Sequence, residues 1–307
     1  MNIQQTANSN LPSALDSIPT ELFIGGKWMD GPERFPVQNP ANSEIVTEVS
    51  DSGPAEAIAA LDAAVAAQSD WRRMAPRARA KLFHKTHSLM LEKAEEFAQI
   101  MTLESGKPLT ESRAEFNLSA DFLLWFSEQI AHLHGTYAES SHGGFRIVTT
   151  HQPIGPCLLI TPWNFPLLMI VRKAGAALAA GCTAICKSAQ ETPLTSALFV
   201  KVLEEAGFPK GTVNLLHSSS AAPISEALMS DPRLRKVSFT GSTKVGSVLL
   251  SQSAPNILNR YLELGGDGPF IVFDDAEIDM AVEQANVCKL LKDGQACVAA
   301  NRIIVYR

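Results

Sequence analysis

The chain has 307 residues, enough for about two domains, and its 46% hydrophobic and 19% charged residues are typical of a folded protein. A net charge of −6 without a cluster of Lys and Arg argues against nucleic acid or a membrane surface as a partner and favours a small-molecule substrate. The five cysteines lack CxxC spacing, which argues against a disulfide framework and a zinc site. Reduced thiols, with neither an export signal nor a membrane-length apolar run, predict a cytoplasmic protein without a bound metal.

The N-terminal part is predicted to hold a tail, a strand pair and packing helices. Residues 1–20 are rich in Asn, Ser, Gln and Pro, which is typical of a flexible tail. Residues 22–28 predict two strands joined by a Gly-Gly turn. Apolar residues at three- and four-residue spacing predict three amphipathic helices, over residues 55–71, 78–101 and 112–133.

Residues 135–152 change to strict alternation, in which Phe145 and Ile147 are separated by polar Arg146. This pattern predicts an exposed hairpin arm. Such an edge often pairs with another subunit, so we expect the arm to serve oligomerisation.

From residue 155 onward, short apolar runs alternate with helical segments. The runs cover residues 156–160, 183–186, 213–216, 237–239 and 261–264. The helical segments cover residues 167–180, 194–206, 222–229 and 244–251. Strand and helix in alternation predict an α/β fold with a doubly wound, Rossmann-like parallel sheet, which binds ligands at the carboxyl ends of its strands.

A second α/β unit is predicted after Gly266, with a strand at 270–274, a helix at 278–291 and a strand at 302–306. We expect this unit to be incomplete, because nothing follows that could cover its last strand. The predicted organisation is a dinucleotide-binding domain over 21–134 and 153–265, the arm over 135–152, and the start of a catalytic domain over 266–307.

Two loops follow predicted sheet strands and could hold a nucleotide. The loop over 239–246 has the pattern GxxxxG before a helix, where free backbone N–H groups accept a phosphate. Lys187 to Gln190 follow another strand, at the edge where riboses bind. An ordinary capped turn and a solvent-facing lysine are the alternatives.

Three side chains could carry chemistry. Cys297 is a nucleophile if its pKa is lowered, and otherwise a small buried hydrophobe. Glu263 follows apolar residues at a strand end and could act as a general base, or be an exposed edge residue. Asn164 lies between Pro162 and Pro166, which fix its backbone, so its amide either donates to an oxyanion or belongs to a plain turn.

Together these segments resemble the aldehyde dehydrogenase superfamily, in the family's order and at its spacing. The motifs that carry the resemblance are ITPWNFP at 160–166, FTGST at 239–243, LELGG at 262–266 and GQAC at 294–297. Further matches at 25–28, 39–41 and 104–108 extend it over nearly the whole chain from about residue 21. The resemblance implies the aldehyde dehydrogenase fold.

The resemblance also assigns roles in catalysis. It implies that Cys297 is the nucleophile, that Asn164 and the Cys297 N–H form the oxyanion hole, and that Glu263 activates the hydrolytic water. Thiolate attack, hydride loss to a nicotinamide and hydrolysis of a thioester each use the residue type that is present.

The coenzyme implied by the resemblance is NADP or NAD. Members that favour NAD often carry Glu where Gln190 stands, and a neutral side chain there removes the repulsion of a 2′-phosphate, which slightly favours NADP. The implied coenzyme-binding residues are Ile160, Thr161, Pro162, Trp163, Asn164, Lys187, Ser188, Ala189, Gln190, Phe239, Gly241, Ser242 and Leu264.

Within the superfamily, residues 170–173 and 269–276 are most similar to succinate-semialdehyde dehydrogenases. In those enzymes the arginine that matches Arg172 helps to hold the substrate carboxylate, although a merely surface-paired arginine is the alternative. Two departures weaken the assignment. The second carboxylate-binding arginine is Leu291 here, next to Lys292, and the frequent second cysteine is Ala299.

Family members are homo-oligomers that continue well over a hundred residues beyond Arg307, so we expect a C-terminally truncated chain without the last oligomerisation strand. The predicted function is NAD(P)-dependent oxidation of an aldehyde, with succinate semialdehyde favoured. The alternatives are a non-catalytic dinucleotide-binding fragment and an inactive paralogue that pairs with a full-length subunit.

Overall fold

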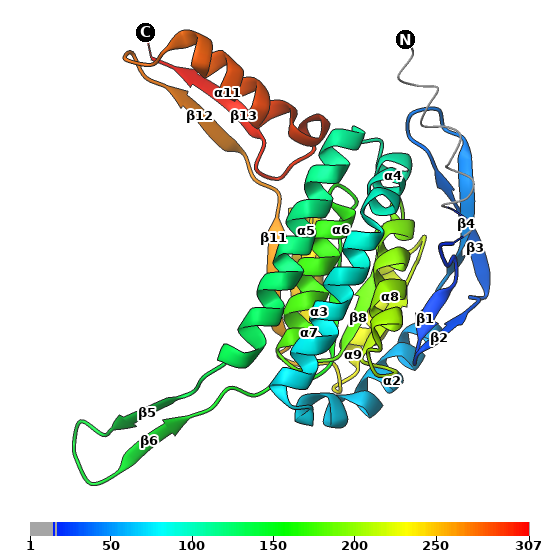
Figure 1. The fold of residues 1–307 in the computed structure, drawn as a ribbon, viewed down its shortest axis with the longest axis vertical. Helices are drawn as coiled ribbons and strands as arrows, with labels where there is room; N and C mark the ends of the chain where they lie inside the picture. The colour runs from blue at the N-terminus through cyan, green and yellow to red at the C-terminus, as the bar shows by residue number, and fades with distance from the viewer. Residues whose placement is uncertain (1–14, 16, 307) are drawn as a thin grey trace.

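The computed structural model describes residue 15 and residues 17–306, and its centre is a seven-stranded sheet (Figure 1). The strand order is β11-β10-β7-β8-β9-β1-β2. Strands β7 to β11 run parallel, and β1 runs antiparallel to β9. Their bounds are β1 Leu22–Ile24, β2 Lys27–Met29, β7 Cys157–Ile160, β8 Ala184–Lys187, β9 Val213–Leu216, β10 Lys236–Gly241 and β11 Asn259–Leu264.

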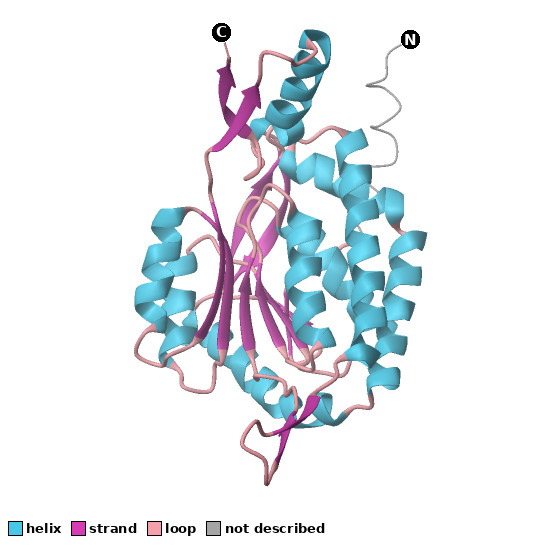
Figure 2. Ribbon diagram, turned by 90° about the vertical axis from the view of Figure 1, so that its left-hand side faces the viewer, coloured by secondary structure: helices cyan, strands magenta, loops and turns pink. Residues whose placement is uncertain are grey.

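Helices cover both faces of this sheet (Figure 2), so the α/β prediction is confirmed. Because side chains alternate along a strand, β7 sends Leu158 to one face and Leu159 to the other, into two separate hydrophobic clusters. One face packs against α2 Pro54–Arg73, α9 Ala221–Ser230 and α10 Thr243–Ser253. The other packs against α3 Pro76–Glu92, α4 Ala94–Ser105, α5 Leu109–Gln129, α7 Ala176–Ala179 and α8 Pro193–Ala206.

The helix predicted over 78–101 is wrong as a single element, because α3 and α4 are separated at Lys93. The backbone there has φ −107° and ψ 17°, and the Lys93 N–H bonds to Met90 O at 3.0 Å, one residue closer than in an α-helix. The change of direction lets Phe97 of α4 pack against Phe116 of α5, with ring centroids 5.7 Å apart. Continuous apolar spacing hides such a break, since both helices bury the same kind of face.

A second correction concerns the helix predicted over 167–180. It consists of α6 Pro166–Ile170, a π-helical turn η2 Val171–Gly175, and α7. Gly175 lies against the ring of Phe126 in α5, where a Cβ would come within 2.8 Å. The π-helical turn carries Arg172 and Lys173, and such turns are frequent at functional sites.

The antiparallel pair β3 Glu33–Gln38 and β4 Ile45–Asp51 was not predicted from the sequence. Pro36 interrupts the strand pattern and weakens its signal. Phe35, Val37 and Val49 nevertheless lie in the core. Most of the predicted tail, residues 1–14 and 16, lies outside the described residues, while Ile18 is buried.

The arm consists of β5 Thr136–Glu139 and β6 Arg146–Thr149, which pair antiparallel and project away from the sheet (Figure 1). Both strands are exposed on both faces. The exposed hairpin that the alternation predicts is therefore present. After α5 the chain reaches this arm through a short 3-10 helix, η1 Ile130–His132.

The last unit is a small parallel sheet of its own. It contains β12 Gly268–Val272, α11 Ile278–Leu290, the 3-10 helix η3 Leu291–Gly294 and β13 Ala300–Val305. Every residue of α11 is exposed or half-buried. Asp267 holds the start of this unit, because Arg302 reaches its carboxylate at 3.0 Å and its carbonyl at 2.9 Å.

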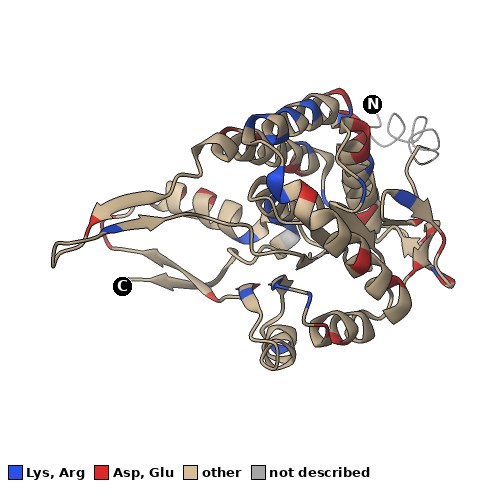
Figure 3. Cartoon of the chain, turned by 90° about the horizontal axis from the view of Figure 1, so that it is seen from below, with Lys and Arg blue, Asp and Glu red and all other residues tan. Residues whose placement is uncertain are grey.

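Acidic and basic side chains are interspersed over the helical layers (Figure 3). Among the described residues, no helix combines the length and apolar character that crossing a bilayer requires.

Glu104 is a buried carboxylate that joins two helices. It lies at the end of α4, and its oxygens accept the N–H groups of Leu194 at 2.8 Å and Thr195 at 3.0 Å, in the first turn of α8. Burial raises the pKa of Glu104 to about 7, even though these hydrogen bonds favour the charged form.

A pH-dependent stability follows from Glu104. Its folded-state pKa of about 7 exceeds the ordinary value of 4.5, so the folded state binds the proton more tightly. The resulting stabilisation is complete below pH 4.5 and is lost as the pH rises to about 7, on the order of 3 kcal/mol in total. In guanidinium titrations between pH 5 and 8, Glu104→Gln should lack this decline. A parallel decline in both proteins would contradict the assignment.

Candidate active site

A cavity of about 610 Å³ opens at the carboxyl ends of β7, β8 and β10. This is where a parallel sheet is expected to bind ligands. Ten of the coenzyme-binding residues predicted from the sequence line it: Ile160, Thr161, Pro162, Trp163, Lys187, Ala189, Gln190, Phe239, Gly241 and Ser242.

The other three predicted coenzyme residues lie outside this cavity. The Ser188 hydroxyl is buried and shares a 2.8 Å hydrogen bond with Nδ1 of His217. Leu264 packs against α10, where a Cβ at Gly246 would come within 2.7 Å of it. Asn164 faces the segment that precedes Cys297.

The cavity also contains residues that were not singled out from the sequence. Val245, Val248 and Leu249 form an apolar face of α10 at three- and four-residue spacing, a signal that was available. Gln252 also lines the cavity, and its buried side-chain oxygen has no hydrogen-bond partner in the described structure. Such an unpaired atom favours a polar ligand.

The start of α10 suits a phosphate group. Ser242 caps the helix by accepting the Val245 N–H at 3.3 Å, and no acidic residue occupies the first turn. Gly241 lets the Phe239 ring lie close to the backbone here, since a Cβ at Gly241 would come within 2.5 Å of that ring. The positive end of the helix dipole and the exposed N–H groups stabilise an anion at this point. The cavity therefore fits a dinucleotide.

A buried ion pair holds the loop that carries Asn164. Lys107 and Glu115 form a salt bridge with both side chains 1% exposed. Lys107 Nζ also donates to the carbonyl of Asn164 at 3.1 Å. Glu115 Oε1 accepts the N–H groups of Leu167 and Leu168 at 3.0 Å each, which caps α6 directly after the loop.

The Asn164 side chain connects this loop to the cysteine segment. Its Nδ2 donates to the carbonyl of Gln295 at 2.8 Å, and its Oδ1 accepts the Phe165 N–H at 3.1 Å. Cys297 follows two residues later and is exposed. A Cβ at Gly266, just after β11, would lie 3.7 Å from the Cys297 carbonyl oxygen. The structure thus brings Asn164, the end of β11 and the Cys297 backbone to one place.

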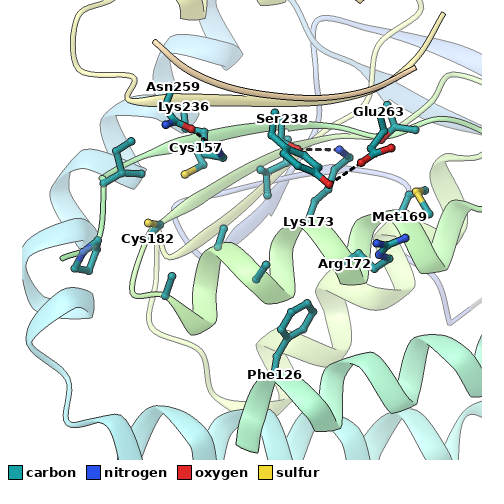
Figure 4. A pocket seen from close by; sticks show the side chains of 18 of the residues that line it. Phe126, Cys157, Met169, Arg172, Lys173, Cys182, Lys236, Ser238, Asn259 and Glu263 are labelled. Carbon is teal, nitrogen blue, oxygen red and sulfur yellow. Dashed lines mark hydrogen bonds between the residues drawn. The ribbon is translucent and has the colours of Figure 1, made fainter. Parts of the chain in front are cut away.

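A second cavity of about 630 Å³ lies on the other face of the sheet and contains Arg172, Lys173 and Glu263 (Figure 4). The Glu263 carboxylate accepts a 2.6 Å hydrogen bond from the hydroxyl of Tyr261. The Arg172 guanidinium lies 5.0 Å from the centre of the Phe122 ring.

Lys173 is the most perturbed of these groups. Its Nζ donates to the Ser238 hydroxyl at 2.8 Å. Burial lowers the pKa of Lys173 to about 8. The negative charge of Glu263 opposes this effect, and the positive charge of Arg172 reinforces it. The side chains that face this cavity therefore include an exposed guanidinium, a carboxylate and an ammonium group whose pKa is lowered.

The predicted catalytic residues are only partly brought together. Cys297 lines neither cavity, and within the described residues no hydrogen bond joins it to Glu263. Leu291 is exposed. Lys292 is buried and directs its ammonium group to the carbonyl of Ser105 at 3.0 Å, while its N–H bonds to Glu111. Lys292 therefore does not replace the arginine that is missing at Leu291.

Comparison with known proteins gives the class to which this arrangement belongs. The model of the aldehyde dehydrogenase family matches residues 28–307, and the chain therefore belongs to that family. Succinate-semialdehyde dehydrogenase of Paenarthrobacter nicotinovorans is 52% identical over 250 residues, which make up 81% of this chain and 56% of that enzyme. The resemblance drawn from the motifs is confirmed.

Solved structures agree on the fold. An NADP-dependent enzyme of E. coli matches with a TM-score of 0.92 and 42% identity, over 97% of this chain and 61% of that one. Betaine aldehyde dehydrogenase of Staphylococcus aureus, in complex with NAD+, matches with a TM-score of 0.95 and 31% identity. The match covers 98% of this chain and 60% of that enzyme. The chain spans 54% to 61% of the length of several succinate-semialdehyde dehydrogenases that it matches.

The Lys107–Glu115 pair provides a stability test. Glu115→Leu leaves a buried ammonium group unpaired and removes the cap of α6, so it should lower the free energy of unfolding by about 3–5 kcal/mol. Lys107→Met/Glu115→Leu should be less destabilising than Glu115→Leu alone, because no charge remains buried. Guanidinium titrations measure both effects.

The matched control is Arg113→Met, also in α5, which breaks the Arg113–Glu95 ion pair. Both of those side chains are 51% exposed, so the free energy of unfolding should change little. If Arg113→Met and Glu115→Leu lowered the free energy of unfolding equally, the burial of the Lys107–Glu115 pair would not be what determines its contribution to stability.

Proposed function

We propose that the chain carries the active site of an NAD(P)-dependent aldehyde dehydrogenase that acts on an aldehyde bearing a carboxylate, such as succinate semialdehyde. The observation that carries the proposal is the 2.8 Å hydrogen bond from Asn164 to Gln295. It joins the loop at the edge of the dinucleotide cavity to the segment of the exposed thiol. The kinship with succinate-semialdehyde dehydrogenases supports the substrate class.

In the proposed reaction, the Cys297 thiolate attacks the carbonyl carbon of the aldehyde and forms a thiohemiacetal. The Asn164 amide, which now donates to Gln295, would turn to the developing oxyanion together with the Cys297 N–H. A nicotinamide coenzyme, when bound, supplies the hydride acceptor. Loss of hydride to that acceptor would turn the thiohemiacetal into a thioester on Cys297. Glu263 then removes a proton from water, which hydrolyses the thioester and releases the carboxylic acid and the thiol.

Coenzyme binding is assigned to the 610 Å³ cavity. Gly241 and Ser242 would hold the pyrophosphate at the start of α10, and Lys187 to Gln190 would contact the adenosine ribose. Gln190 is exposed and uncharged, which suits either NAD or NADP and slightly favours NADP. Relatives of both kinds are known, an NADP-dependent enzyme and a complex with NAD+.

Arg172 is the proposed partner of the substrate carboxylate. Its guanidinium lines the same cavity as Glu263, and a planar fork of donors matches a carboxylate. Arg172 is present, but Leu291 stands where the resemblance implies a second carboxylate-binding arginine. We therefore propose that this chain binds the substrate carboxylate more weakly than an enzyme with both arginines.

The alternatives are a non-catalytic dinucleotide-binding fragment and an inactive paralogue that pairs through the arm over 135–152 with a full-length subunit. The first is favoured because Cys297 lines neither cavity, and the second because β5 and β6 are exposed on both faces. In either case we propose the division into a dinucleotide-binding domain over 21–134 and 153–265 and the start of a catalytic domain over 266–307.

Coenzyme reduction, followed by absorbance, separates these proposals. The purified chain with succinate semialdehyde and NADP or NAD should show turnover that Cys297→Ala abolishes, since the nucleophile is lost. Cys288→Ala, which changes another exposed thiol, is the matched control and should retain it. Coenzyme binding measured by fluorescence, without turnover in any variant, would reject the enzyme proposal and favour the binding module.

Gln190→Glu tests the coenzyme assignment. A carboxylate at this position repels a 2′-phosphate, so the Kd for NADP should rise at least about tenfold relative to that for NAD. Gln252→Glu adds the same charge elsewhere in the cavity and controls for a general electrostatic effect. Equal changes of both Kd values in Gln190→Glu would place the adenosine ribose elsewhere.

A further inference from the structure

Two thiols that have no role in the proposed reaction line the 630 Å³ cavity, at the end opposite Glu263 (Figure 4). Cys157 is the first residue of β7, and its N–H bonds to the carbonyl of Thr183 at 2.9 Å, next to Cys182. Both cysteines belong to the same hydrophobic cluster, so they lie on the same face of the sheet. Both are buried, at 1% and 4% exposure, and both line the cavity, which is the side from which a small reagent would reach them.

The turn at Gly155 gathers polar groups around these sulfur atoms. Gly155 has φ +122°, a conformation that L side chains rarely adopt, and its carbonyl lies 3.3 Å from the Cys157 sulfur. Lys236 of β10 is the register partner of Cys157 and lines the same cavity. A cation and a turn of backbone dipoles therefore lie beside two otherwise buried thiols.

These groups make the two thiols unequal. Hydrogen bonding with Cys157 lowers the pKa of Cys182 to about 6, with Gly155, Ile154 and the charge of Lys236 acting in the same direction against burial. The same hydrogen bond raises the pKa of Cys157. One sulfur is thus favoured as a thiolate and its neighbour as a thiol.

We propose that Cys182 and Cys157 form a dithiol site that is oxidised by hydroperoxides. The Cys182 thiolate attacks the peroxide oxygen, an S–O bond forms as the O–O bond breaks, and the leaving oxygen takes a proton from water. The Cys157 sulfur then attacks the Cys182 sulfur, and an S–S bond replaces the S–O bond. The hydroxyl leaves with the Cys157 proton as water. The two thiols lose two electrons, which reduce the peroxide.

Cys186 provides an internal control. It lies on β8 and belongs to the same hydrophobic cluster, but it is fully buried and does not line the cavity. Burial raises the pKa of Cys186 to about 12. Its thiol should resist the reagent that oxidises Cys182.

The test uses the full chain with Cys288→Ser and Cys297→Ser, which removes the two exposed thiols. After treatment with hydrogen peroxide and unfolding, thiol titration should show the loss of two thiols of three. Peptide mass mapping should find the new disulfide between Cys157 and Cys182. Cys186 should react at least about tenfold more slowly than Cys182.

Further substitutions in this background separate the two roles. With Cys157→Ser, the reaction should stop at a sulfenic acid on Cys182 that dimedone traps, and Cys186→Ser should leave the disulfide unaffected. Retention of both thiols in the parent chain, oxidation of Cys186 at a similar rate, or a disulfide between other residues would overturn the proposal. None of these readouts depends on coenzyme, aldehyde or Cys297, so their outcome is independent of the proposed dehydrogenase activity.

Discussion

The buried ion pair between Lys107 and Glu115 is the contact on which the geometry of the site depends. Removing two charges from water costs several kcal/mol per ion, and the cost is offset only when further hydrogen bonds use the remaining atoms. Here they do: Lys107 reaches the carbonyl of Asn164, and Glu115 caps α6 through two N–H groups. The pair thus fixes the backbone at Asn164 and the first turn of α6, on either side of Phe165, and so holds the segment that directs the Asn164 amide to Gln295.

The parallel sheet explains why two cavities lie so close and yet differ. Successive side chains of a strand point to opposite faces, so β7 and β10 contribute to both cavities. On one face, α10 presents its N-terminus and an apolar side, which suits a phosphate and a flat ring system. On the other, the π-helical turn presents Arg172 and Lys173 toward Glu263.

How far the sequence predicts this structure depends on the range of the interactions. Local patterns were sufficient for the βα array and the arm, while most of the residues expected at the dinucleotide cavity were implied by the resemblance to a family. They failed where a tertiary contact decided the outcome: the helix over 78–101 breaks at Lys93 so that Phe97 meets Phe116. Ser188 follows its strand as expected, but His217, directly after β9, binds its hydroxyl away from the cavity. No spacing within one segment encodes such contacts.

The cysteines show the same limit in chemical terms. One residue type occupies three environments: Cys297 is exposed beside the Asn164 loop, Cys186 is enclosed by apolar side chains, and Cys182 lies at a turn near Lys236. Charge, hydrogen bonding and burial set the reactivity of a thiol, and all three come from other segments of the chain. Motif and position alone would single out only Cys297. The packing of β7, β8 and β10 sets Cys182 apart, because it brings Gly155, Cys157 and Lys236 to one end of the sheet.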